Sequence, residues 1–245
     1  MPHVMAAVLA GGTGSRMGGA VPKQLLPLAG RPVLEHAVAA FQDAPEVDEV
    51  LVVMAPDHLR EAERIAAPFP KVTAVLPGGS TRTDSSVAAL RAVEARPGSD
   101  LLLLHDAARP LVARTTVAAA VAALEHAGAV GVAVPSSDTV VRVAPGGGGA
   151  EAVAEVPPRA ELRRMQTPQG FRLEVLRRAY AAALADPDLV ATDDCGVVLR
   201  YLPGEPVHIV AGTEANIKVT HPGDVEVAEA LLRREAGRGA GEGER

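Results

Sequence analysis

The sequence predicts an α/β fold, in which a Rossmann-like and mostly parallel sheet is flanked by helices and a β-hairpin arm projects from the body. Three observations support this prediction. Hydrophobic residues make up 48% of the 245 residues but aromatic residues only 2%, so the core has to be built from Ala, Val and Leu. Such residues suit buried parallel strands and the Ala-rich helices that cover them. Short apolar runs also alternate with helical segments, and glycine or another turn residue follows several of the runs.

Short apolar runs mark the expected strands. The run MAAVLA at residues 5–10 stops at Gly11, and the run DLLLLHDAARP at residues 100–110 predicts the clearest buried strand of the chain. Further strands are expected in VDEVLVVMA, VTAVLPGG and AVGVAVPSSDTVVRV. Ligands of such sheets bind outside the carboxyl ends of the strands, so residues 11–19 and 106–109 are candidates for a site.

Helical spacing marks the segments between these strands. RPVLEHAVAAFQDA carries apolar residues at helical intervals behind Pro32, which suits a first turn. RTDSSVAALRAVEA is expected to be a helix with Thr83, Asp84 or Ser85 as its cap. RTTVAAAVAALEHAG closes at Gly128, and the helical pattern returns in LEVLRRAYAAALAD and GDVEVAEALLRR. This alternation is typical of a sheet with helices on both faces.

The alternation breaks at residues 136–159. DTVVRVAPGGGGAEAVAEVPPR is β-prone, lacks helical periodicity and has a glycine-rich turn in its middle, which predicts a hairpin arm. An apolar arm that projects from a compact body needs a partner, so a homodimer is expected. The tail at residues 235–245 is rich in glycine and charge and is expected to be disordered, which leaves residues 1–234 as one domain.

The charge balance and the single cysteine exclude several classes of protein. The 24 Lys and Arg residues against 30 Asp and Glu residues give a net charge of −6, unlike the basic footprint of a nucleic-acid-binding domain. The single Cys195 excludes an intramolecular disulfide and argues against a structural zinc site. No apolar run approaches 18 residues, and no basic stretch precedes an apolar signal region. We expect a soluble cytoplasmic protein with no nucleic acid or membrane as partner, in which a local cluster of cations holds any anionic substrate.

The glycine-rich segment VLAGGTGSRMGGAVPKQLLPLAG follows the first strand. A strand, a glycine-rich loop and basic residues can present backbone N–H groups and charge to a phosphate. The spacing from Gly12 through Gly14 to Gly18 is one residue too long for a dinucleotide-binding fingerprint, which argues against an oxidoreductase. Lys23 follows Val-Pro rather than glycine, so a Walker loop is excluded too. The segment remains either an ordinary turn or a phosphate loop with two cations, Arg16 and Lys23.

Three further features have ordinary structural explanations. His105 is expected to pack or hydrogen-bond at a strand end, and Cys195 to be a small buried residue without redox function. Asp193 and Asp194 are expected to cap a helix rather than to bind a metal. None of the seven histidines stands in the sequence context of a catalytic nucleophile.

Seven motifs follow one another in the order GGTGSRM with PKQLLPL, GGSTRTDSS, HDAARP, DTVVRV, QTPQGF, TDD and NIKVTHPGD. In these motifs the chain resembles the sugar-phosphate cytidylyltransferases, and most of all those that act on 2-C-methyl-D-erythritol 4-phosphate in isoprenoid biosynthesis. The resemblance runs from about residue 6 to residue 232. It implies a nucleotidyltransferase domain in which a phosphate oxygen of the sugar phosphate attacks the α-phosphorus of CTP and releases pyrophosphate.

The resemblance implies roles for single residues in binding CTP. Arg16 and Lys23 match the catalytic pair that stabilises the triphosphate and the transition state. Asp106 matches a carboxylate near Mg²⁺, the implied cofactor, which phosphate oxygens would hold for the most part. The positions that match nucleotide-binding residues are Ala10, Gly11, Gly12, Gly14, Gly79, Arg82, Ser85, Asp106 and Ala107.

The second substrate has its own matching positions, which are Arg109, Thr139, Arg159, Thr167 and Lys218. Each of them alone reads as an ordinary surface residue, but together they supply the positive cluster that an acidic protein needs for two anionic substrates. The resemblance places Thr139, Arg159 and Thr167 on the side of the arm, where they would serve the neighbouring subunit's site. Dimerisation would then be a condition for activity.

Two alternatives stay open on the sequence. Gly12 and the Cys195 that follows two aspartates resemble the ribitol 5-phosphate cytidylyltransferases, which make CDP-ribitol, whereas DAARP resembles the methylerythritol enzymes. The other alternative is a non-catalytic nucleotide-binding regulator of the same fold. The presence of Arg16, Lys23 and Asp106 argues against a regulator.

Overall fold

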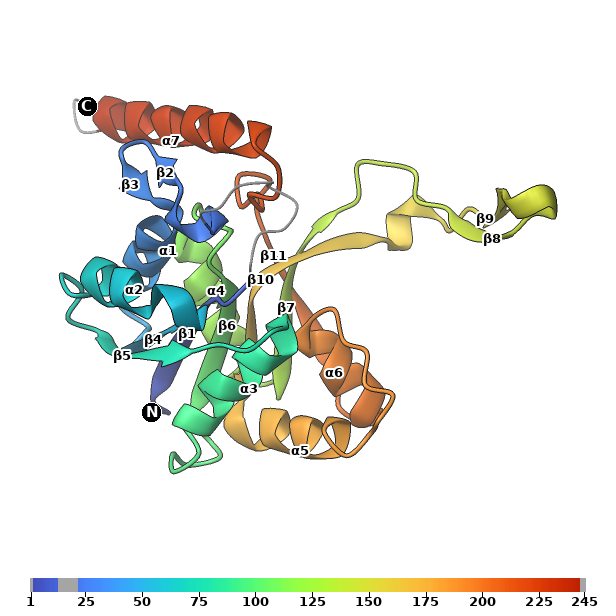
Figure 1. Cartoon of the computed structure of the whole chain (residues 1–245), viewed down its shortest axis with the longest axis horizontal. Helices are drawn as coiled ribbons and strands as arrows, with labels where there is room; N and C mark the ends of the chain where they lie inside the picture. The colour runs from blue at the N-terminus through green and yellow to red at the C-terminus, as the bar shows by residue number, and fades with distance from the viewer. Residues whose placement is uncertain (1, 13–21, 243–245) are drawn as a thin grey trace.

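The computed structural model describes residues 2–12 and 22–242 of the chain, with side chains up to residue 234. A seven-stranded sheet in the order β11-β7-β10-β6-β1-β4-β5 forms its centre (Figure 1). The strands are β1 (Val4–Ala10), β4 (Glu49–Met54), β5 (Val72–Pro77), β6 (Leu101–Asp106), β7 (Ala129–Pro135), β10 (Arg163–Arg172) and β11 (Val207–Ala211). All neighbours pair in parallel except β10, which is antiparallel to both β6 and β7. The predicted α/β class with a mostly parallel sheet is confirmed.

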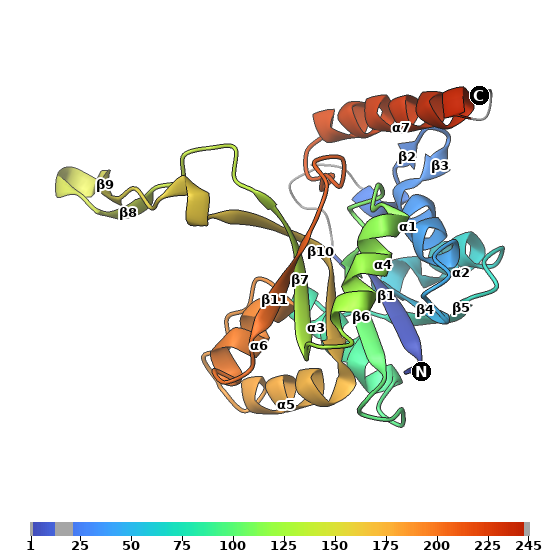
Figure 2. The same ribbon diagram turned by 180° about the vertical axis from the view of Figure 1, so that it is seen from behind.

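Helices cover both faces of this sheet (Figures 1 and 2). One face packs against α1 (Val33–Gln42), α2 (Leu59–Ala66) and α4 (Arg114–Ala123), and the other against α3 (Arg82–Ala92), α5 (Leu173–Ala183) and α6 (Asp194–Tyr201). In β1, Ala6 and Val8 join the first core cluster, whereas Met5 and Ala7 join the second. Since both faces are buried, every residue of the strand is apolar and the run reads as continuous.

Short elements complete the chain. They are β2 (Pro27–Leu28), β3 (Arg31–Pro32) and the 3₁₀ turns η2 (Lys23–Leu25), η3 (Pro56–His58), η4 (Gly147–Gly149) and η5 (Arg159–Glu161). The last helix, α7 (Gly223–Glu242), packs Ala228 against Leu28 and Val33 beside the β2–β3 hairpin. No helix among residues 2–12 and 22–242 is long and apolar enough to cross a membrane.

One expectation about a helix end needs correction. The cap of α3 is Thr81 rather than residue 83, 84 or 85, because the Thr81 hydroxyl accepts from the Asp84 N–H at 3.0 Å while the Asp84 carboxylate accepts from the Thr81 N–H at 2.9 Å. This capping box starts the helix at Arg82, two residues earlier than a cap at Thr83 would. The last helix continues to Glu242, because extending an existing helix is far easier than starting one, and the expected disorder of residues 235–245 stays a prediction.

A β-hairpin stands where the sequence predicts the arm. Its strands β8 (Arg142–Pro145) and β9 (Glu151–Glu155) pair antiparallel and extend away from the ends of β7 and β10 (Figures 1 and 2). Five of its valines are between 41% and 61% exposed, and these are Val140, Val141, Val143, Val153 and Val156. The predicted hairpin is present, and its contact with a second subunit stays a prediction.

Candidate active site

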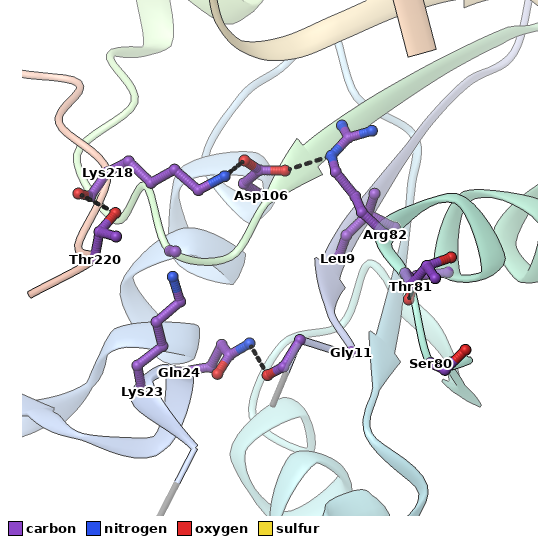
Figure 3. Close-up of a pocket in the computed structure, with 13 residues that line it drawn as sticks. Leu9, Gly11, Lys23, Gln24, Ser80, Thr81, Arg82, Asp106, Lys218 and Thr220 are labelled. Carbon is purple, nitrogen blue, oxygen red and sulfur yellow. Dashed lines mark hydrogen bonds and ion pairs between the residues drawn. The ribbon is translucent and has the colours of Figure 1, made fainter. Parts of the chain in front are cut away.

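A pocket of about 270 Å³ opens at the carboxyl ends of β1 and β6, beside the start of α3 (Figure 3). Parallel sheets bind their ligands at this edge. Seven residues predicted from the sequence line it, namely Gly11, Gly12, Lys23, Arg82, Ser85, Asp106 and Lys218. Six further lining residues were not predicted, namely Leu9, Gln24, Ser80, Thr81, Ala108 and Thr220.

Backbone forms the wall after β1. A Cβ on Gly11 would collide with the Ser85 hydroxyl, so glycine lets α3 approach the end of β1. The side-chain amide of Gln24 donates to the carbonyls of Ala10 at 3.1 Å and Gly12 at 3.0 Å, which fixes the first part of the glycine-rich loop. The wall therefore offers backbone groups and little side chain, which lets a ligand approach the backbone closely.

Lys23 provides a positive charge from the side of η2. Its side chain is only 9% exposed, and its ammonium donates to the Val219 carbonyl at 3.0 Å. Val219 belongs to the segment 216–220, which connects β11 to α7 and also supplies Lys218 and Thr220 to the pocket. Residues from opposite ends of the chain thus share one wall (Figure 3).

Asp106, the last residue of β6, accepts from two cations. The Arg82 Nε lies 2.9 Å from one carboxylate oxygen, and the Lys218 Nζ lies 2.7 Å from the other (Figure 3). Burial alone would raise the pKa of Asp106, but the charges and hydrogen bonds of Arg82 and Lys218 outweigh burial and hold that pKa well below its usual range. Lys23, Arg82 and Lys218 outnumber this one carboxylate in the lining, so the pocket is positive although the protein is acidic.

Behind the pocket, Arg82 is held from its other side by Asp194. The Arg82 Nη1 lies 2.6 Å from an Asp194 carboxylate oxygen, and Asp194 has no exposed surface. The sequence does not predict this contact, because two aspartates before a helix favour a helix cap. That interpretation is confirmed for Asp193, whose carboxylate accepts from the Gly196 N–H at 2.8 Å, and it is wrong for Asp194.

Thr167 lies directly behind Asp106 in the same chain, because β10 runs between β6 and β7. Its hydroxyl accepts from the Asp106 N–H at 3.1 Å and lies 3.0 Å from the His105 Nδ1. The His105 Nε2 lies 2.9 Å from the Arg109 carbonyl, so this nitrogen carries the proton and Thr167 donates to the other. Burial lowers the pKa of His105 to about 4, and the imidazole is neutral at pH 7. The expected hydrogen bonding of His105 is confirmed.

The remaining predicted residues lie outside the pocket lining or outside the described residues. The Arg109 guanidinium donates to the Asn216 carbonyl at 2.8 Å and the Met165 carbonyl at 3.1 Å, which ties segment 216–220 to β10. Gly79 contacts the Asp84 side chain, and Ala10 and Ala107 are buried at strand ends. Thr139 and Arg159 are exposed on the arm. Gly14 and Arg16 are not among the described residues.

The donor set of the pocket fits a magnesium ion that is held mostly by its substrate. No group of three or more His, Cys, Asp or Glu side chains in the described part of the chain could hold a metal. Asp106 is ionised, and each of its oxygens accepts one hydrogen bond and keeps a second lone-pair site. One such carboxylate together with substrate phosphates is a usual arrangement for Mg²⁺.

A family model for 2-C-methyl-D-erythritol 4-phosphate cytidylyltransferase matches residues 4–234. The protein of that name from Thermobifida fusca (strain YX) is 65% identical over 234 residues, which cover 95% of this chain and 94% of that protein. The crystal structure of the Thermus thermophilus protein of that name superposes with a TM-score of 0.71 at 36% identity, covering 95% of this chain and 100% of that one.

A relative with a different acceptor in its name also matches. The bifunctional ribulose 5-phosphate reductase/CDP-ribitol pyrophosphorylase Bcs1 of Haemophilus influenzae is 40% identical over 228 residues. The match covers 92% of this chain but 47% of that protein. Sequence, fold and pocket agree, and the chain belongs to the 2-C-methyl-D-erythritol 4-phosphate cytidylyltransferase family.

Proposed function

We infer that this chain joins CTP and 2-C-methyl-D-erythritol 4-phosphate to give 4-diphosphocytidyl-2-C-methyl-D-erythritol and pyrophosphate, in isoprenoid biosynthesis. The observation that carries this conclusion is the 65% identity to a protein of that activity over 95% of this chain. The ribitol 5-phosphate alternative has weaker support, since that relative is 40% identical and more than half of it lies outside the match. A positive pocket in an acidic protein suits two anionic substrates, and the identity to an enzyme favours catalysis over a purely regulatory role.

The chemistry needs positioning and charge rather than an activated side chain. The attacking oxygen belongs to a phosphate that is already an anion near neutral pH, so the step requires no strong general base. Lys23 and Lys218 reach the pocket from two sides and would offset the negative charge that gathers when one phosphate approaches another. His105 is buried behind the pocket and neutral, which fits a structural rather than a proton-transfer role.

We propose Mg²⁺ as the cofactor, with Asp106 as its protein ligand. When bound, the ion would withdraw charge from the phosphate oxygens of CTP and orient the triphosphate. The protein's own part is to keep the Asp106 carboxylate ionised and fixed in direction, through Arg82 on one oxygen and Lys218 on the other. Arg16 is proposed to neutralise the triphosphate together with Lys23.

The direct test compares two acceptors. Pyrophosphate release is measured with CTP and Mg²⁺, once with methylerythritol 4-phosphate and once with ribitol 5-phosphate. Release with the first acceptor alone is expected. Release with the second alone would move the activity to CDP-ribitol synthesis, and no release with either acceptor would contradict a cytidylyltransferase of either kind.

We further propose that the protein is a cytoplasmic homodimer in which the arm reaches the neighbouring pocket. Five exposed valines on the arm support an apolar contact, and the exposed Thr139 and Arg159 would face the partner's second substrate. Thr167 is not part of that contribution, because it lies behind Asp106 of its own chain.

Chain exchange tests this arrangement. Lys23→Met disables a chain's own pocket, whereas Arg159→Ala disables the pocket of its partner. Mixing the two inactive variants after unfolding and refolding should restore about a quarter of wild-type activity, because half of the dimers are mixed and each has one intact pocket. A mixture no more active than its components would contradict a shared site. For assembly itself, Val153→Asp on the arm should give monomers in light scattering, and the control Val190→Asp, also at an exposed valine, should not.

A further inference from the structure

Asp194 begins α6 and lies fully buried beneath the pocket floor. Its first carboxylate oxygen accepts from the Tyr180 hydroxyl at 2.5 Å, and its second accepts from the Arg82 Nη1 at 2.6 Å. The backbone N–H of Asp194 donates to the Gln169 side chain at 2.9 Å. Two donors on the carboxylate and one anchor on the backbone hold Asp194 in place, and the residue does not line the pocket.

Arg82 transmits that position to the pocket. A guanidinium is a rigid planar fork, so fixing its Nη1 on Asp194 also fixes the direction of its Nε. The Nε donates to Asp106 at 2.9 Å. The second partner of Asp106 is the Lys218 ammonium, which sits on a flexible stem and is 38% exposed, and it constrains the carboxylate less.

We propose that Asp194 is a positioning residue for cytidylyl transfer, which acts through Arg82 to fix the Asp106 carboxylate at the pocket. The inference rests on the proposed function. Buried ion pairs are often no more stabilising than well-packed apolar side chains, so holding the fold is a poor explanation for this cluster. Fixing one geometry at a reacting centre is a better one, since a displacement of about 1 Å can cost about 100-fold in rate.

A second cluster of the same residue types, built on a partly exposed aspartate, provides a control for the loss of the charge. Asp186 accepts from the Tyr201 hydroxyl at 2.6 Å and from the Arg200 Nη2 at 2.9 Å. This Tyr–Asp–Arg group joins the end of α5 to α6, as Tyr180 and Asp194 do, but it lies away from the pocket lining. Asp186→Asn therefore removes the same kind of charge without any route to Asp106.

The experiment is a double-mutant cycle with Asp194→Asn, Arg82→Gln and the double variant. Asp194→Asn should lower kcat/KM by about 10–100-fold, the range for partners that orient a ligand residue. It should raise the KM for CTP as well as lower kcat, because a displaced Asp106 affects both. In the Arg82→Gln background, Asp194→Asn should lower kcat/KM by less than about twofold, because the contact through Arg82 is already absent. Asp186→Asn should keep wild-type kinetics.

Several outcomes would overturn the inference. Losses that multiply in the double variant would show that Asp194 acts without Arg82. A lower kcat with unchanged KM for CTP would show only less active protein, as a structural role predicts. If Asp194→Asn does not fold, Tyr180→Phe takes its place in the cycle, with an expected loss of about 2–10-fold that disappears in the Arg82→Gln background.

A second measurement distinguishes failure of the proposed function from failure of the inference about Asp194. CTP affinity with Mg²⁺ is measured by calorimetry for each protein alongside turnover. A wild-type protein that binds CTP but releases no pyrophosphate contradicts the proposed function. In that case the double-mutant cycle is evaluated on CTP affinity alone. Asp194→Asn should then weaken CTP binding only when Arg82 is present.

Discussion

Replacing Lys23 by Met separates the catalytic role of this side chain from its structural one. Met keeps an unbranched stem of similar length but removes the charge and the hydrogen bond to the Val219 carbonyl, which measures 3.0 Å. Losing a buried bond from a charged donor should cost about 2 kcal/mol of unfolding free energy. For a domain of this size that lowers the Tm by about 4–8 °C, so the protein stays folded at assay temperature.

The loss in turnover should be much larger. Removing one group that offsets charge in a transition state costs about 3–4 kcal/mol, or about 10²–10³ in kcat. The assay is pyrophosphate release with saturating CTP, methylerythritol 4-phosphate and Mg²⁺. A folded Lys23→Met protein with turnover within about threefold of wild type would refute the reasoning.

Lys71 supplies the control. Its ammonium also donates to a backbone carbonyl, that of Ala44 at 2.7 Å, and it lies outside the pocket lining. Lys71→Met should therefore lower the Tm to a similar extent and leave turnover unchanged. An equal loss of turnover in both variants would show that the assay reports stability rather than catalysis.

Three further predictions follow from the same geometry. Gly11→Ala should raise the KM for CTP about tenfold, because its Cβ collides with Ser85, whereas the control Gly204→Ala enters open space and should change nothing. The His105 pKa of about 4, against 6.5 when unfolded, means that the unfolded chain binds the extra proton, so stability is complete above about pH 6.5. Between pH 6.5 and pH 4 the free energy of unfolding measured by urea titration should fall by on the order of 3 kcal/mol. The His105→Gln variant should lack this pH dependence. Burial raises the pKa of the Cys195 thiol, so a thiol reagent should modify it only after unfolding, and rapid modification of the folded protein would contradict its burial.

Local patterns predict five of the seven strands of the sheet but neither β11 nor the antiparallel strand β10. The strands β1, β4, β6 and β7 are mostly buried apolar runs, and the edge strand β5 is an apolar segment interrupted by Thr73, so the local pattern indicates all five. The strand β10 has the sequence RRMQTPQGFR, in which polar residues and a proline hide the strand pattern. Only its pairing with β6 and β7 makes it a strand, and that pairing joins segments far apart in the chain.

The site divides in a similar way. Short motifs at the ends of strands contain Lys23, Asp106 and Lys218, and all three line the pocket. The sequence indicates them because loops at strand ends are where ligands bind. Asp194 was missed because an aspartate before a helix reads first as a cap. Its real partner, Arg82, is 112 residues away, and no local pattern encodes such a contact.

The segment 216–220 also sets when, during synthesis, the enzyme becomes active. Lys23 is fixed by a carbonyl 196 residues further along the chain. At about 5–20 residues per second, a ribosome needs about 10–40 s to cover that distance. Until then a nascent chain lacks the Val219 carbonyl that binds Lys23 and the charge of Lys218. We therefore expect incomplete chains to lack activity, so that truncated products of translation would not consume CTP.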